Sequence, residues 1–145
     1  MKNSKPLGIA DESGFLFAQE MLAGDKTAGI NFDRLQHHPE KGYIIFEYLL
    51  CAETQKVDPW TSHPRRYWDK NKQKFISLKK VADDLKAKLY LINYAKKGTE
   101  HENKIKIIEV IKIDNKKGII EEKVRDCSRE EFQQWFRKLN KECLK

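Results

Sequence analysis

The sequence has few cysteines, glycines and prolines. Its three cysteines, Cys51, Cys127 and Cys143, are odd in number and far apart, and they form no C-x-x-C pair. This pattern excludes a disulfide framework and argues against a structural zinc site, so we expect free thiols in a reducing compartment. With only seven glycines and four prolines among 145 residues, the chain is also neither collagen-like nor of low complexity.

Long hydrophobic runs are absent too. No apolar stretch approaches the length that crosses a bilayer, and the opening residues, MKNSKPLGIADESG, lack the apolar core of a signal peptide. We therefore expect a cytoplasmic protein with no membrane partner. The length predicts a single domain over residues 1–145, which would bury roughly two thirds of its unfolded surface.

Charge is abundant, and positive charge prevails. Lysine and arginine number 29 against 22 acids, which gives a net charge of +7. Such an excess makes nucleic acid the first partner to consider. The alternative is that the lysines only solvate the surface, and charge alone leaves both interpretations open.

Apolar periodicity predicts three helices. The first covers residues 12–24, and the clearest begins at Ser77, where apolar residues recur at i, i+3, i+4 and i+7. Ser128 followed by Glu131 forms a capping box that opens the last helix. A helix placed between strands indicates a crossover connection, and hence some parallel pairing.

Runs of β-branched and aromatic residues predict five strands. They cover residues 27–36, 43–51, 89–95, 105–113 and 119–124. The predicted order is therefore α-β-β-loop-α-β-β-β-α. This order indicates an α/β or α+β fold in which helices flank a mixed central sheet.

The first two strands form a hairpin that brings two acids together. If its turn, HHPEKG, is centred on residue 40, the numbers of paired residues sum to 80, so Asp33 and Glu47 are cross-strand neighbours. Such neighbours have Cβ atoms about 4.5–5.5 Å apart, where two ionised carboxylates repel. A hard divalent cation would relieve that repulsion. A slip of one residue would instead separate the acids, leaving Asp33 to pair with a surface cation such as Arg34.

The arrangement over residues 12–95 resembles the PD-(D/E)XK, or restriction-endonuclease-like, nuclease superfamily. On this resemblance Asp33 matches the first motif acid, Glu47 matches the acid of the (D/E)XK half, and Glu20 matches the accessory acid of the first helix. Phe32 replaces the motif proline, and Leu49 occupies the lysine position. Some members of the superfamily supply the lysine from a neighbouring element, and the segment DKNKQK offers Lys70, Lys72 and Lys74, of which we assign Lys74 to the site.

The resemblance also implies function. It predicts an Mg²⁺- or Mn²⁺-dependent nuclease whose metal is held by Asp33 and Glu47, with DNA favoured over RNA as substrate and a homodimer as a common assembly. Because Leu49 stands at the lysine position, a second interpretation is favoured. In it the site is catalytically degenerate, and the protein binds nucleic acid or binds a nucleic-acid enzyme as a regulator or inhibitor. A basic domain that engages a protein partner is a third reading.

The segment PWTSHPRRYWDKNKQK, residues 59–74, combines aromatic and basic side chains. Cations of this kind bind phosphates and aromatic faces stack on exposed bases. We therefore predict a nucleic-acid surface made of Trp60, Arg65, Arg66, Trp68, Lys70 and Lys72. In the alternative reading, the tryptophans fold back into a small core and the cations are ordinary surface charge.

Two other patterns lead to weaker hypotheses. Glu121-Glu122-Lys123 is a literal Glu-x-Lys, but it follows the crossover helix instead of preceding it, so we interpret it as a solvated strand edge. His37, His38 and His63 are interpreted as turn residues or phosphate contacts, because no downstream motif completes a histidine-based nuclease.

Overall fold

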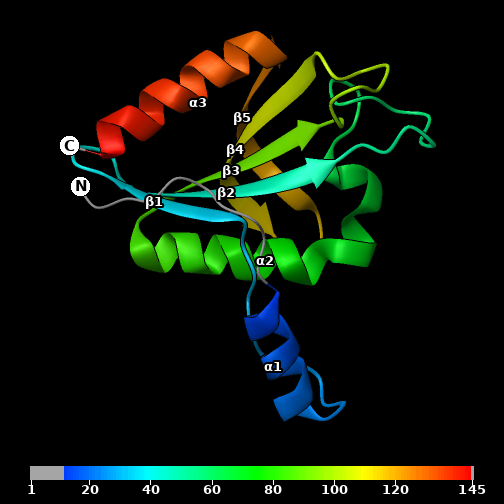
Figure 1. Cartoon of the computed structure of the whole chain (residues 1–145), viewed down its shortest axis with the longest axis vertical. Coiled ribbons are helices and arrows are strands. Elements are labelled where there is room, and N and C mark those ends of the chain that lie inside the picture. The colour runs from blue at the N-terminus through cyan, green and yellow to red at the C-terminus, as the bar shows by residue number, and fades with distance from the viewer. Residues whose placement is uncertain (1–11, 145) are drawn as a thin grey trace.

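The computed structural model describes residues 12–144 and contains a five-stranded mixed sheet with helices on both faces (Figure 1). Strands follow one another across the sheet in chain order, β1-β2-β3-β4-β5. The elements are α1 (Ser13–Leu22), β1 (Arg34–His38), β2 (Gly42–Leu50), η1 (Pro64–Tyr67), α2 (Trp68–Leu85), β3 (Lys88–Tyr94), β4 (Lys104–Asp114), β5 (Gly118–Ser128) and α3 (Arg129–Cys143). The predicted α+β class is confirmed.

The pairing pattern follows from the connections. β1 and β2 form an antiparallel hairpin, and β3, β4 and β5 form an antiparallel meander. β2 and β3 are parallel, because α2 carries the chain back across the sheet between them. The one parallel pair therefore lies at the centre, as the helix between strands predicts.

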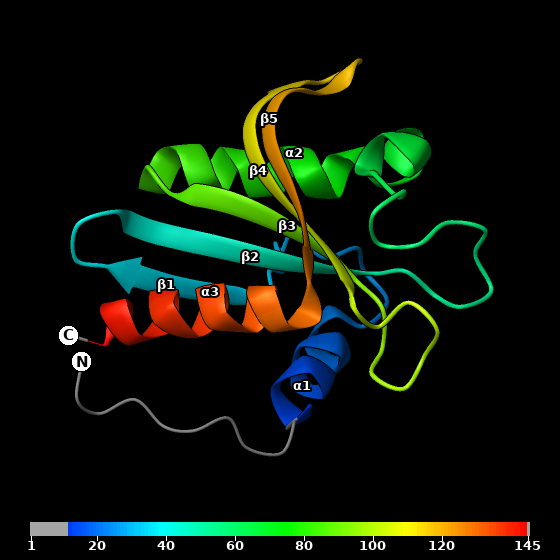
Figure 2. The same cartoon turned by 90° about the horizontal axis from the view of Figure 1, so that it is seen from above.

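Two hydrophobic clusters cover the two faces of the sheet. On one face α2 packs through Phe75, Leu78 and Ala82 against odd-numbered residues of β2 and β3. On the other face α3 packs through Trp135 and Leu139 against even-numbered ones. Figure 2 shows the sheet between the two helices. Central strands of this kind are apolar on both faces, as the runs at residues 43–51 and 89–95 predict.

Three boundaries differ from the predictions. The first strand begins at Arg34, not at residue 27, and residues 23–33 are exposed coil. The middle helix begins at Trp68, nine residues before Ser77. Its first turns are mostly polar, so the apolar period becomes clear only later. The last strand extends from Gly118 to Ser128 and leads directly into α3, whose predicted capping box is confirmed.

α1 is separate from the rest of the fold. None of its residues is buried, and Figure 1 shows it projecting below α2. Phe15, Leu16, Phe17 and Met21 are all more than half exposed. No helix in residues 12–144 has the length and apolar character that a membrane span requires.

Candidate active site

The hairpin of β1 and β2 has the register that its turn predicts. Arg34 pairs with Phe46 and His38 pairs with Gly42, so the numbers of paired residues sum to 80. The backbone N–H of Asp33 donates to the carbonyl of Phe46 at 3.2 Å, which extends the pairing one step. Asp33, the residue before β1, therefore lies beside Glu47 of β2.

Glu47 is a buried carboxylate on the α2 face of the sheet. Its exposed fraction is 5%. One oxygen, Oε2, forms an ion pair with Lys74 Nζ, and the other, Oε1, has no hydrogen-bond partner in the described chain. Asp33 is held beside it, because the backbone N–H of Tyr48 donates to Asp33 Oδ2 at 2.7 Å.

The environment of Glu47 opposes its ionisation. Burial raises the pKa of its carboxyl above the ordinary value, the hydrogen bond and charge of Lys74 lower it, and the Asp33 carboxyl raises it again. The net shift is upward. Glu47 is thus a buried carboxylate with one oxygen lacking a hydrogen bond to any described residue and a second acid beside it. A further positive charge at this place would stabilise its ionised form.

Lys74 comes from α2, two turns into the helix. Leu49 lies on the same face of β2 as Glu47, but it packs against the hydrophobic cluster under α2. A lysine at position 49 would have to place its charge in that cluster. Lys74 instead has a half-exposed side chain that reaches Glu47 from α2. The structure thus brings the predicted lysine to the predicted acid, although its catalytic role stays a prediction.

Asp33 and Glu47 together fit a hard divalent cation. The unpartnered Glu47 Oε1 and the Asp33 carboxylate offer the oxygen ligands that Mg²⁺ prefers. Within residues 12–144 no group of three or more His, Cys, Asp and Glu side chains is arranged to hold a metal. Since Mg²⁺ often binds through one or two carboxylates and completes its shell with water and substrate phosphate, two acids suffice for such a site.

Glu20 is not brought to this site. It lies on α1, where every side chain from Ser13 to Met21 is exposed, and no ion pair or hydrogen bond of the described chain joins it to Asp33 or Glu47. The sequence places Glu20 correctly at the edge of an apolar helical face. What it does not reveal is that this helix packs on none of the sheet in the described structure.

The residues predicted to bind nucleic acid differ in their exposure to solvent. Arg65 has a side chain 70% exposed, and Lys70 and Lys72 are exposed on the first turns of α2. Trp68, by contrast, is 6% exposed and stacks on Phe75 at 5.9 Å between ring centroids. The prediction that Trp68 stacks on a base is therefore wrong, because its ring is part of the core.

Trp60 and Arg66 take intermediate positions. The Trp60 indole N–H donates to the carbonyls of Ile105 and Cys127, which ties this ring to β4 and β5 while leaving it partly exposed. Lys104 Nζ lies 5.1 Å from the centre of the Trp60 ring. Arg66 donates to the hydroxyl of Ser62 at 3.3 Å, so its guanidinium is partly engaged within the loop.

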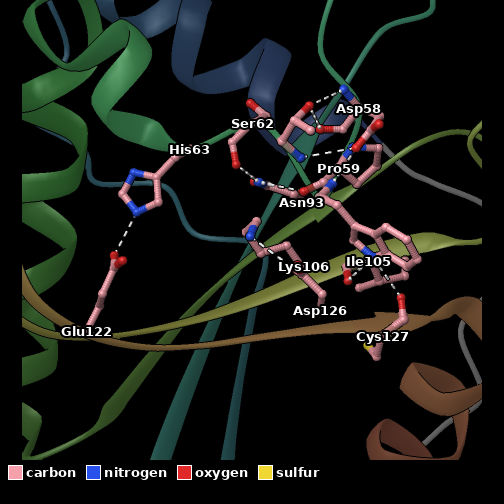
Figure 3. A network of polar contacts seen from close by, with 12 residues as sticks. Asp58, Pro59, Ser62, His63, Asn93, Ile105, Lys106, Glu122, Asp126 and Cys127 are labelled. Atoms are coloured by element: carbon pink, nitrogen blue, oxygen red, sulfur yellow. Dashed lines mark hydrogen bonds and ion pairs between the residues drawn. The ribbon is translucent and has the colours of Figure 1, made fainter.

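The loop before α2 is rigidly anchored (Figure 3). Asn93, which is fully buried on β3, donates to the carbonyls of Pro59 and Ser62. Asp58 accepts from Lys104 at 3.0 Å and from the backbone of the next turn. These two anchors were missed at the sequence level, although an asparagine in an otherwise apolar strand is a usable signal of a buried polar contact.

His63 and Glu122 form a further anchor. The Arg65 backbone N–H donates to His63 Nδ1, so the Nε2–H donates to Glu122 Oε1 at 2.7 Å (Figure 3). Burial lowers the pKa of His63, and Glu122 offsets part of that effect. Within the Glu-x-Lys segment of β5, Glu122 therefore helps to hold the loop through His63. This segment lies on the strand farthest from β1.

The other two histidines are the last residues of β1 and pair with Tyr43 and Gly42, so the prediction that they lie in the turn is wrong. His38 is buried and accepts from the backbone N–H groups of Glu40 and Lys41, while its other nitrogen contacts Glu142 at 2.9 Å. His37 is exposed, and its ring contacts that of Tyr43 across the hairpin.

No protein-family model, curated protein or solved structure matches the chain. The meaning of the Asp33, Glu47 and Lys74 constellation therefore rests on its own geometry and charge.

Proposed function

We propose that the protein is a metal-dependent nuclease that hydrolyses phosphodiester bonds. The observation that carries this proposal is the meeting of Asp33, Glu47 and Lys74 on one face of the sheet, with a buried carboxylate oxygen left unpartnered. Two acids and a lysine are the groups that the PD-(D/E)XK resemblance requires, and here the lysine is supplied by α2.

Each of the three side chains has a role in this proposal. Asp33 and Glu47 would hold the divalent cation, which when bound would supply an activated water and positive charge for the phosphoryl oxygen. Lys74 orients the Glu47 carboxylate and places a further positive charge beside the reacting phosphate. The Tyr48 N–H keeps Asp33 aimed at Glu47.

Exposed cations on α2 support a nucleic-acid substrate. Lys70 and Lys72 lie on the same helix as Lys74, whereas Arg65 lies 3.6 Å from Glu122 of β5 and is farther from the site. Such side chains bind phosphates without regard to sequence. DNA as the preferred substrate, a homodimer and a cytoplasmic location remain further parts of this proposal.

A second candidate function rests on Leu49. If the Lys74 ammonium neutralises Glu47 permanently, the site needs no metal, and the protein binds nucleic acid or a nucleic-acid enzyme without cleaving anything. This second function uses the same basic surface as the nuclease. It differs only in that no phosphodiester bond is cleaved.

The test uses labelled single- and double-stranded DNA and RNA with Mg²⁺, Mn²⁺ or EDTA. We expect cleavage with metal that falls by at least ~100-fold in Glu47→Gln and Asp33→Asn, because removing a group that stabilises transition-state charge costs about two to three orders of magnitude. Glu121→Gln, a matched exposed carboxylate on β5, is the control and should retain full activity.

The outcomes separate the two functions. Binding without cleavage under every metal condition would favour the non-catalytic protein. Cleavage that survives in Glu47→Gln and Asp33→Asn, or that is lost equally in Glu121→Gln, would refute the site.

A further inference from the structure

A groove on the opposite face of the sheet is unused by the proposed nuclease. It lies between α3 and residues 123–127 of β5, the part of the strand that leads into α3. The far end of the β4–β5 hairpin curves away from α3 (Figure 2). Two adjoining hollows of about 180 and 350 Å³ make it up, and both are lined by Arg125 and Trp135. Because α2 and the Asp33–Glu47 pair are on the other side, this groove is separate from the candidate active site.

The available charge of the groove is positive. Its three cations, Lys123, Arg125 and Lys138, form no ion pair with any carboxylate of residues 12–144. Two of its acids are paired with lysines, Glu109 with Lys88 and Asp126 with Lys106. The third, Glu131, accepts from the backbone N–H of Ser128 and is attracted by the charge of Arg125, so three cations stand against one acid without an ion pair in the described chain.

Trp135 gives the groove a fixed aromatic wall. Its ring is packed edge-on by Tyr90 at 5.3 Å and by Phe46 at 6.0 Å between centroids. The Arg125 guanidinium carbon lies 5.8 Å from the centre of the same ring. The guanidinium lies over part of the indole ring, and a base can stack on the part of the ring that it leaves open.

The inner end of the groove carries a donor and an acceptor. Tyr90, Glu109 and Lys123 follow one another across β3, β4 and β5, since Tyr90 pairs with Glu109 and Glu109 with Lys123. Burial and the nearby Glu109 raise the pKa of the Tyr90 phenol to about 12, so it remains a hydroxyl donor at neutral pH. The Glu109 carboxylate can accept from the amino group of a base.

We propose that this groove binds a nucleoside phosphate, with Arg125 and Lys138 on the phosphate and the base against Trp135, beside Tyr90, Glu109 and Lys123. The ligand is either a free nucleotide or one unit of a nucleic-acid strand that passes over the α3 face. The proposal is independent of the nuclease activity, because it uses none of the residues of the α2 face.

The test uses the full chain in EDTA, so that no metal-dependent cleavage interferes. AMP, GMP, CMP and UMP are titrated by calorimetry, and a short fluorescein-labelled single-stranded DNA is titrated by anisotropy. Lys123→Ala/Arg125→Ala removes two exposed groove cations, and Arg137→Ala/Lys141→Ala removes two exposed cations of α3 outside the groove as the matched control.

We expect the groove variant to bind at least about tenfold more weakly, because a hydrogen bond to a charged group contributes about one order of magnitude in affinity. The control should change affinity by less than about twofold. In heteronuclear NMR of the wild type, the Trp135 indole N–H resonance should shift on addition of the ligand.

The two sources of the ligand give different patterns. Mononucleotide binding that is lost in the groove variant identifies a free nucleotide, whereas loss confined to the oligonucleotide identifies a strand. The proposal is overturned if neither probe binds at millimolar concentration, if both variants lose affinity equally, or if binding leaves the Trp135 resonance unmoved.

Discussion

Lys74→Met tests the electrostatics of the candidate site, because it removes the ammonium and keeps most of the apolar stem. In the wild type, Glu47 binds its proton more tightly in the folded protein than in the unfolded chain, since its pKa is raised from an ordinary value of 4.5. Its contribution to stability therefore falls as pH rises from that value through the raised pKa. Lys74 lowers the pKa of Glu47 and so limits this loss of stability. Removing the Lys74 charge should therefore make the loss larger.

The expected magnitude lies between two limits. Leaving a fully buried charge without its partner costs about 3–5 kcal/mol, while an exposed pair contributes about 0–1 kcal/mol. Here Glu47 is buried and the Lys74 side chain is 46% exposed, so solvent replaces part of the lost interaction. We expect Lys74→Met to lower the free energy of unfolding by about 1–2 kcal/mol at high pH, and by much less when Glu47 is protonated.

The assay is urea unfolding at about pH 8 and about pH 4, chosen to lie on either side of the titration of Glu47. A double-mutant cycle with Glu47→Gln isolates the pair, and Lys74→Met should cost little in the Glu47→Gln background. Equal destabilisation at both pH values, or an unchanged cost in Glu47→Gln, would refute the electrostatic reasoning and assign the effect of Lys74 to its aliphatic stem.

Three further predictions concern the rest of the molecule. Because burial lowers the pKa of His63, stability should decline as pH falls from the ordinary histidine value of 6.5 through that lowered pKa, and His63→Gln should flatten this part of a thermal-unfolding pH profile. Trp68→Ala should lower the free energy of unfolding in urea by about 3–5 kcal/mol, because it empties a core position. Trp60→Ala should cost clearly less, since its ring is 40% exposed, and equal costs would contradict the core assignment of Trp68. Phe17→Ser should change the free energy of unfolding by less than about 0.5 kcal/mol, because its side chain is 62% exposed on a helix with no buried residue. A large loss of stability would show that α1 is buried in solution.

Local patterns in the sequence determine the hairpin and the acid pair. The turn HHPEKG lies between two apolar runs, and the two-residue period of a strand then places Asp33 and Glu47 on one face. The same local logic predicts the crossover helix, the parallel pair at the centre and the capping box of α3. These features depend on residues that are close in the sequence or joined by one short turn. The amino-acid sequence alone is therefore sufficient to infer them.

Only the tertiary structure decides which side chains join that pair. Lys74 reaches Glu47 because α2 crosses the sheet above β2, and Trp68 is buried because the same helix begins a full two turns earlier than its apolar period suggests. Glu20 stays apart because α1 packs on no strand. Each outcome depends on how a helix is placed over a sheet, which is set by the shape of the whole core and not by spacing along the chain.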